Sequence, residues 1–126
     1  MTMKEKKLAE SGKFLRSPCP VACTLDILGD KWTLLVVRDL FAGKRKYGEL
    51  QASFEKIPTN ILAERLKRLI EQQIIVKSPY QSHPVRYEYT LTAKGKELGV
   101  VLKAMVQWGE KHITGSKASL MSPLKK

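Results

Sequence analysis

The stretch "IPTNILAERLKRLIEQQIIV", Ile57 to Val76, combines an apolar stripe with a polar one along a single expected helix, residues 58–72. At 3.6 residues per turn, Leu62, Leu66 and Leu69 fall on the same side of that helix. A proline near its start is tolerated because the first turn of a helix does not use the missing N–H. The leucine side is therefore expected to face a core, and the other side to stay exposed.

The exposed side of this helix carries mostly polar side chains. Asn60, Glu64 and Lys67 lie opposite the leucines, and Arg65 and Arg68 lie on the flanks. Side chains that form hydrogen bonds gather near its N-terminal end. A helix face that is merely solvated has the same pattern, so this face alone does not identify a partner.

Composition limits the classes of protein to consider. The chain has 126 residues, 43% of them hydrophobic, which is enough for one domain with its own core. Its formal net charge of +11 favours a polyanionic partner, either nucleic acid or an anionic membrane surface, with a solvated lysine-rich surface as the alternative. No apolar run approaches the roughly 20 residues that span a bilayer, and no secretory signal is apparent. The lack of such a run leads us to expect no membrane partner, and the presence of only two cysteines suits the reducing cytoplasm.

Three helices are expected before the opening stretch. In "CPVACTLDILGD" apolar residues recur at helical spacing and Gly29 can end the helix. Asp30 then suits the cap of "KWTLLVVRDLFAG", which Gly43 would end. "YGELQASF" is expected to form a short helix with Leu50 and Phe54 turned inward.

A hairpin and a long helix are expected after it. Residues 74–77 are mostly apolar, and in residues 86–91 two sets of side chains alternate along the chain, as expected for strands. The loop between these two strands contains Pro79, Ser82, His83 and Pro84. Thr92 can cap one continuous helix, residues 93–112. Two consecutive helices followed by a two-stranded hairpin form the plan of a winged helix-turn-helix. The predicted fold class is α+β, mainly helical, with added N-terminal and long C-terminal helices for dimerisation.

The predicted domain covers residues 18–113. Residues 1–17 are polar and rich in lysine, and residues 114–126 have no periodic pattern. We expect a flexible basic N-terminal arm and a flexible C-terminal tail around one winged helix-turn-helix domain.

A series of short motifs runs along the chain. The first positions are Cys19-Pro20, Gly29, Lys31-Trp32, Arg38, Gly43, Arg45 with Lys46, Tyr47 and Glu49-Leu50, and "IPTNILAERLKRL" and "RYEYTLTAKG" follow them. In this order they resemble the motifs of the HxlR-type bacterial transcriptional regulators, which are relatives of the MarR group. The likeness covers about residues 18 to 112. The sequence departs from the family pattern at Gln73, where glycine is usual and the helix end must be capped another way, at "HPVR" in the wing, and at the extra thiol Cys23.

This resemblance implies a homodimeric regulator that binds double-stranded DNA. In such a fold the helix at residues 58–72 enters the major groove, and the wing at residues 78–86 lies on the backbone or minor groove. Phosphate contacts position the protein, and contacts to base edges select the sequence. The candidate DNA-binding residues are Lys44, Arg45, Lys46, Pro58, Thr59, Asn60, Ala63, Glu64, Lys67, His83 and Arg86. For any one of them, simple solvation is the alternative.

Dimerisation has its own signal in the sequence. The first and last helices carry more large apolar residues than one small core needs, notably Val21, Leu25, Val101, Met105 and Trp108. Apolar stripes in excess of what the core needs are usually buried against a partner, here a second copy of the chain. A two-fold dimer would then require a near-palindromic operator. The alternative is that these residues close the core of the monomer.

The cysteines are the candidates for chemistry. Cys19 would lie at a helix N-terminus, where the dipole and free N–H groups lower the pKa of a thiol. In some members of the resembled family, a cysteine matching Cys19 senses oxidants or electrophiles, and Cys23 could serve as a resolving thiol. The alternative for both is a small buried hydrophobic residue. The sequence therefore leaves open whether an oxidant or a small molecule acts as an effector of this protein.

Other chemistry is not indicated. His83 and His112 are far apart, and two cysteines four residues apart make a poor zinc set. No catalytic triad or phosphate-binding glycine loop appears, so we expect no enzyme, no metal and no cofactor. A winged-helix module that binds RNA or a protein, without preference for a DNA sequence, remains the alternative function.

Overall fold

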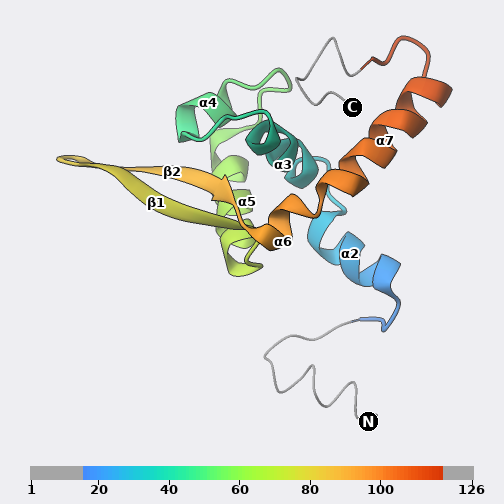
Figure 1. Cartoon of the computed structure of the whole chain (residues 1–126), viewed down its shortest axis with the longest axis horizontal. Coiled ribbons are helices and arrows are strands. Elements are labelled where there is room, and N and C mark those ends of the chain that lie inside the picture. The colour runs from blue at the N-terminus through green and yellow to red at the C-terminus, as the bar shows by residue number, and fades with distance from the viewer. Residues whose placement is uncertain (1–15, 118–126) are drawn as a thin grey trace.

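The computed structural model describes residues 16–117, and Figure 1 shows the order of the elements. Most of the expected N-terminal arm and C-terminal tail lies outside these residues. The elements are α2 (Pro20–Leu28), α3 (Thr33–Phe41), α4 (Tyr47–Gln51), α5 (Thr59–Glu71), β1 (Ile75–Ser82), β2 (Val85–Leu91), α6 (Ala93–Lys96) and α7 (Gly99–His112). This mixture of helices and one antiparallel hairpin confirms the predicted winged helix-turn-helix class. Within the described range, no helix has the length and apolar character to cross a bilayer.

The core forms where α3 and α5 meet the base of the hairpin. Leu62, Leu66 and Leu69 of α5 are buried, as their spacing predicts. Val37 of α3 and Ile75 at the start of β1 are buried against the same cluster. The hairpin projects from this body on the side away from α2 and α7 (Figure 1). The core therefore fixes α5 and the root of the hairpin relative to each other.

The expected C-terminal ends of α2 and α3 are confirmed. Gly29 is the C-cap of α2, and Gly43 follows the C-cap of α3 with a φ of +98°, a conformation that glycine adopts without strain. The Asp30 carboxylate accepts the backbone N–H groups of Trp32 (3.0 Å) and Thr33 (3.1 Å). The N-cap residue of α3 is Trp32 and not Asp30 as expected, but the Asp30 side chain still satisfies two N–H groups at the start of this helix.

The prediction of a long wing loop is wrong. β1 continues to Ser82 and pairs with β2 across a turn of only two residues, with a register shift between Pro79 and Gln81. Proline indicated a loop, but β1 is an edge strand, where the missing N–H of Pro79 costs no ladder bond. The wing is therefore a longer, more regular arm than expected.

The inward orientation of Phe54 is also wrong. Leu50 is buried as predicted, but Phe54 is 72% exposed. α4 ends at Gln51, and after it Ser53, rather than Phe54, is the residue that is buried. The Ser53 hydroxyl accepts a hydrogen bond from Arg38 (3.1 Å). A polar network replaces the expected aromatic contact.

The expected long C-terminal helix is divided into α6 and α7. Thr92 does cap α6, accepting the N–H of Gly95 at 3.0 Å. Gly95 lies so close to the hairpin that a Cβ there would be 2.1 Å from the Ile74 carbonyl oxygen. This contact fixes α6 against the hairpin, and the chain changes direction before α7 begins.

The end of α5 is capped by backbone geometry together with side chains from the next helix. Gln73 itself adopts a left-handed φ of 61°, and the N–H of Ile74 reaches back to the Leu69 carbonyl at 2.9 Å. Thr92 donates its hydroxyl to the Gln73 carbonyl (2.7 Å), and the Lys94 ammonium donates to the Gln72 carbonyl (2.7 Å). The end of α5 is therefore capped without a glycine, as expected from the sequence.

Candidate nucleic-acid interface

The outer face of α5 is open. Asn60, Ala63 and Lys67 are exposed there, while the leucine stripe is buried beneath them. Pro58 is the N-cap and is exposed as well. These residues are therefore accessible to a duplex.

The N-terminus of α5 is tied to α4. Tyr47 donates its hydroxyl to the backbone carbonyl of Thr59 (2.8 Å), and the Gln51 amide donates to the Thr59 hydroxyl. Thr59 is exposed, but both of these acceptors are engaged within the protein. The structure thus favours Thr59 as the residue that sets the angle between the two helices.

Glu64 lies on the outer face of α5, where neighbouring arginines engage it. Its carboxylate forms ion pairs with Arg65 and Arg68 on the same helix. Arg65 also donates to Asp30 at 2.8 Å, between the α2 and α3 helices. A carboxylate occupied in this way is less available to accept from cytosine than the sequence suggested.

The basic segment Lys44–Lys46 lies alongside β2. The N–H of Tyr89 donates to the Arg45 carbonyl (2.8 Å), and Lys46 forms an antiparallel bridge with Glu88. The Glu49 carboxylate accepts the N–H groups of Arg45 (2.9 Å) and Lys46 (3.0 Å). These backbone hydrogen bonds lower the pKa of Glu49, so the carboxylate stays charged and fixes the segment.

The hairpin carries one cation, Lys77, that was not among the residues predicted from the sequence. His83 and Arg86 are exposed near its tip, as expected. The Lys77 ammonium also lies 4.3 Å from the Tyr87 ring centre, and that of Lys46 lies 4.5 Å from the Tyr80 ring centre. The sequence does show aromatic residues in both strands and a lysine in one of them. Which lysine lies against which ring depends on the register of the strands, and the sequence alone does not give that register. The hairpin therefore presents Lys77 supported by one tyrosine ring, and a second tyrosine of the hairpin supports Lys46 from the segment before α4.

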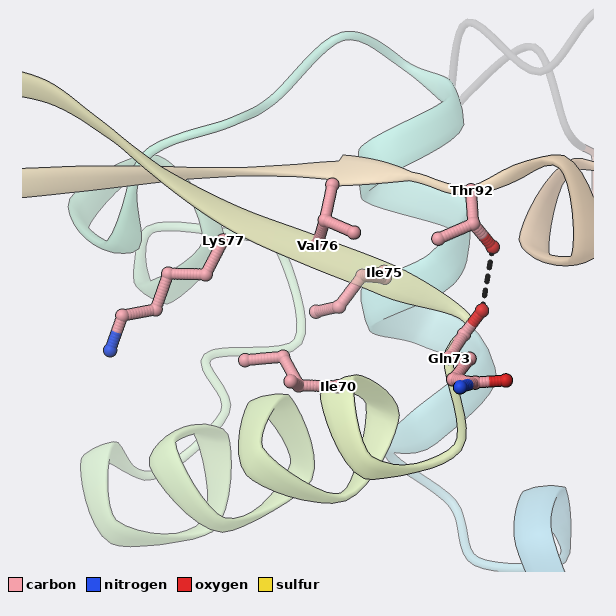
Figure 2. Close-up of a pocket in the computed structure, with 6 residues that line it drawn as sticks. All are labelled: Ile70, Gln73, Ile75, Val76, Lys77 and Thr92. Carbon is pink, nitrogen blue, oxygen red and sulfur yellow. Dashed lines mark hydrogen bonds between the residues drawn. The ribbon is translucent and has the colours of Figure 1, made fainter.

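An open apolar hollow of about 440 Å³ lies between α5 and the root of β1 (Figure 2). Ile70 points from α5 towards Ile75 and Val76, and Lys77 stands at one side. The Thr92–Gln73 hydrogen bond closes the opposite end. This flank of α5 thus faces the hairpin, and the Arg65 flank faces the other way.

Apolar residues on α2 and α7 remain outside the monomer core. Val21 is 67% exposed and Trp108 is 62% exposed, and Leu25 and Met105 are exposed too. Val101 is half-buried. Four of the five residues expected at a dimer interface therefore lie outside the core of the described chain.

Both cysteines are free thiols near the start of α2. Cys19 is exposed at the N-cap, and hydrogen bonds from the backbone N–H groups of Ala22 and Val21 lower the pKa of its thiol. The Cys23 thiol is partly buried and donates to the Ser17 carbonyl (3.1 Å). Among residues 16–117, no group of His, Cys, Asp and Glu could hold a metal ion.

Comparison with known proteins gives a consistent result. The HxlR-like helix-turn-helix family model matches residues 27–117. An HTH-type transcriptional regulator of Mycobacterium tuberculosis is 37% identical over 93 residues, which are 74% of this chain and 58% of that relative. The chain thus spans less than two thirds of the length of this relative.

Solved structures with the same fold are also similar in sequence. The crystal structure of PA1607, described as a candidate transcription factor, has a TM-score of 0.72 and 43% identity, covering 79% of this chain and 69% of that one. The redox regulator HypR in its oxidised form has a TM-score of 0.68 and 31% identity, covering 75% and 97%. These names describe regulators rather than enzymes, in agreement with the prediction from the sequence. Because the family model covers most of the chain, and both fold and motifs agree with it, this protein belongs to the HxlR-like helix-turn-helix family.

Proposed function

We propose that this protein is a homodimeric transcriptional regulator that binds a specific DNA sequence. α5 enters the major groove, and the β1–β2 hairpin lies along the backbone or the neighbouring minor groove. The observation that carries the proposal is the division of α5 into a buried leucine stripe and an open face with Asn60, Ala63 and Lys67. A helix anchored in this way can present side chains to base edges without losing its place in the core.

Charge supports a duplex as the partner. The net charge of +11 favours association with a polyanion and the release of counterions. Lys44, Arg45 and Lys46 contact phosphates in this proposal, and His83 and Arg86 do so from the wing. Asn60 pairs with adenine, since its amide can donate and accept at once.

Two copies of the chain associate through α2 and α7 in this proposal. Val21, Leu25, Met105 and Trp108 are exposed apolar residues on these two helices, with Val101 beside them. Burying them against a second copy would remove a large apolar surface from water. The two α5 helices would then read a near-palindromic operator.

Cys19 is proposed as the site that responds to a signal. It is exposed, its thiol pKa is lowered, and it begins one of the two helices of the proposed interface. HypR, a structural relative, is named a redox regulator. Modification of Cys19 by an oxidant or an electrophile would change the interface and thus the spacing of the two α5 helices. Cys23 is a resolving thiol only if the first turn of α2 opens.

Binding to two duplexes tests the function. The protein is titrated against DNA from upstream of its own gene and against a scrambled duplex, at two salt concentrations. We expect a preference of roughly 10³-fold or more for the upstream site. Equal and steeply salt-dependent binding would contradict the proposal and favour a merely basic surface, or a winged helix that recognises RNA or protein. Sedimentation of the free protein tests the dimer.

A further inference from the structure

The side chain of Asp30 connects α3 and α5. One carboxylate oxygen accepts hydrogen bonds from the N–H groups of Trp32 and Thr33 and from the Nε of Arg65, and the other accepts the Thr33 hydroxyl. Arg68 approaches the same carboxylate at 3.8 Å. Asp30 therefore both supports the start of one helix and anchors two arginines on another.

This anchor is rigid on the α3 side. Thr33 is completely buried, so the backbone and hydroxyl groups that hold Asp30 cannot move without disturbing the core. The side chains of Asp30 and Arg65 are only 22% and 17% exposed. Solvent screens this ion pair less than a fully exposed one.

The two flanks of α5 are held differently. On one flank Ile70 faces the hairpin across the apolar hollow (Figure 2). Arg65 and Arg68 lie on the opposite flank, where charge rather than apolar contact holds the helix. Glu64 shares these arginines, but its side chain is 50% exposed, so Asp30 is the better-buried partner of Arg65. Arg68 lies closer to Glu64 (3.3 Å) than to Asp30 (3.8 Å), so its link to Asp30 is the weaker of the two.

We propose that Asp30 is a positioning residue for DNA specificity: by binding Arg65 and Arg68 it fixes α5 and withholds two guanidinium groups from phosphates. This inference rests on the proposed function. A guanidinium is always charged and binds any phosphate, whatever the base sequence. With both arginines engaged, contacts at the open face of α5 depend mainly on side chains that reach base edges. Asp30 acts through Arg65 and Arg68 and itself touches no DNA.

The test compares Asp30→Asn with Asp26→Asn. Asparagine caps a helix about as well as aspartate, so the first change preserves the start of α3 while removing the charge that holds Arg65. Asp26 lies on α2 and pairs with the exposed Arg16 at 2.7 Å, far in sequence from α5. Both variants raise the net charge by one, so their difference isolates the position of the lost charge.

We expect Asp30→Asn to stay folded but to unfold at a lower temperature than wild type, because a partly buried ion pair is lost, and to bind scrambled DNA more tightly. The slope of log affinity against log salt should steepen by about 1 for each freed arginine that reaches a phosphate. The ratio of operator to scrambled affinity should fall about tenfold, a change that a role in stability alone would not produce. In Asp26→Asn the slope and the ratio should stay close to wild type.

A double variant tests the route of the effect. Adding Arg65→Gln to Asp30→Asn removes the freed cation, so the salt slope should return most of the way to the wild-type value. If the slope of the double variant stays at that of Asp30→Asn, or if Asp26→Asn changes slope and ratio equally, the inference is overturned. If wild-type protein shows no preference between duplexes, the proposed function fails instead. The difference in slope between the two single variants then still tests whether Asp30 withholds Arg65.

Discussion

The hydroxyl of Tyr47, the first residue of α4, donates a hydrogen bond of 2.8 Å to the carbonyl of Thr59, the first residue of α5. The two helices of the helix-turn-helix pair are thus joined directly at their N-termini. The Gln51 amide adds a second link through the Thr59 hydroxyl. In the proposed complex the first turn of α5 is closest to the bases, so this link would set which base edges Asn60 can reach.

Replacing Tyr47 by phenylalanine removes that hydrogen bond and keeps the ring. We expect a loss of about 0.5–1.5 kcal/mol in the free energy of unfolding, since one hydrogen bond is lost. Operator affinity should fall several-fold more than affinity for scrambled DNA, because the reading helix becomes less fixed. Denaturant unfolding and fluorescence anisotropy measure the two effects. An unchanged ratio of affinities would show that this bond does not position α5.

Asn60→Ala tests base recognition. The exposed amide lies in the first turn of α5, and its loss should cost roughly 1–3 kcal/mol on the operator and relax the sequence preference. Lys46→Ala is the comparison, because a phosphate contact should weaken operator and scrambled duplexes alike. If Asn60→Ala also weakens both duplexes equally, Asn60 does not read bases.

The fold could be predicted from the sequence because helix periodicity and apolar burial agree. Leu62, Leu66 and Leu69 share a face by spacing alone, and the core uses that face. Gly43 ends α3 with a positive φ, which few residues other than glycine adopt easily. Local signals of this kind need no knowledge of distant neighbours.

Features that depend on distant neighbours were not predictable in the same way. Pro79 lies in a strand because β1 is an edge, and Phe54 turns outward because Ser53 joins the Arg38 network. The link between Asp30 and Arg65 joins residues 35 positions apart. No periodic pattern reports such a pair, so the anchoring of the candidate site appears only in three dimensions.

Gly95→Ala should destabilise the protein. A Cβ at this position would lie 2.1 Å from the Ile74 carbonyl oxygen, so α6 or the hairpin must shift at a cost of roughly 1–3 kcal/mol. Gly48→Ala is the matched control, because a Cβ there has no heavy atom within 4 Å among the described neighbours. It lies in α4, where alanine should stabilise by about 0.4–1 kcal/mol. Equal melting temperatures for the two variants would contradict the close approach at Gly95.

Glu55→Gln should make the free energy of unfolding less sensitive to pH in the acid range. Arg38 donates two hydrogen bonds to the Glu55 carboxylate (2.9 and 2.7 Å), and this lowers its pKa below the ordinary 4.5. A lowered folded-state pKa stabilises the protein above the pKa of the unfolded state, and this contribution is lost as the pH falls through the folded-state pKa. The difference in unfolding free energy between wild type and variant should therefore be largest at neutral pH and shrink below about pH 4.5. Urea unfolding across this range measures it, and a difference that does not change with pH would exclude the linkage.

Cys19→Ser tests the proposed response to electrophiles without removing the cap of α2, because serine is also a favourable N-cap residue. In the proposed reaction the Cys19 thiolate adds to a ring carbon of a quinone, and the ring takes up a proton to give the hydroquinone thioether. The lowered pKa of the exposed thiol favours this reaction at neutral pH. We expect a quinone to release wild-type protein from its operator and to leave Cys19→Ser bound, with an adduct detected by mass spectrometry only when Cys19 is present. Cys23→Ser is the control and should still release, because the Cys23 thiol is partly buried against the Ser17 carbonyl. Release of Cys19→Ser at the same quinone concentration would assign the response to another group.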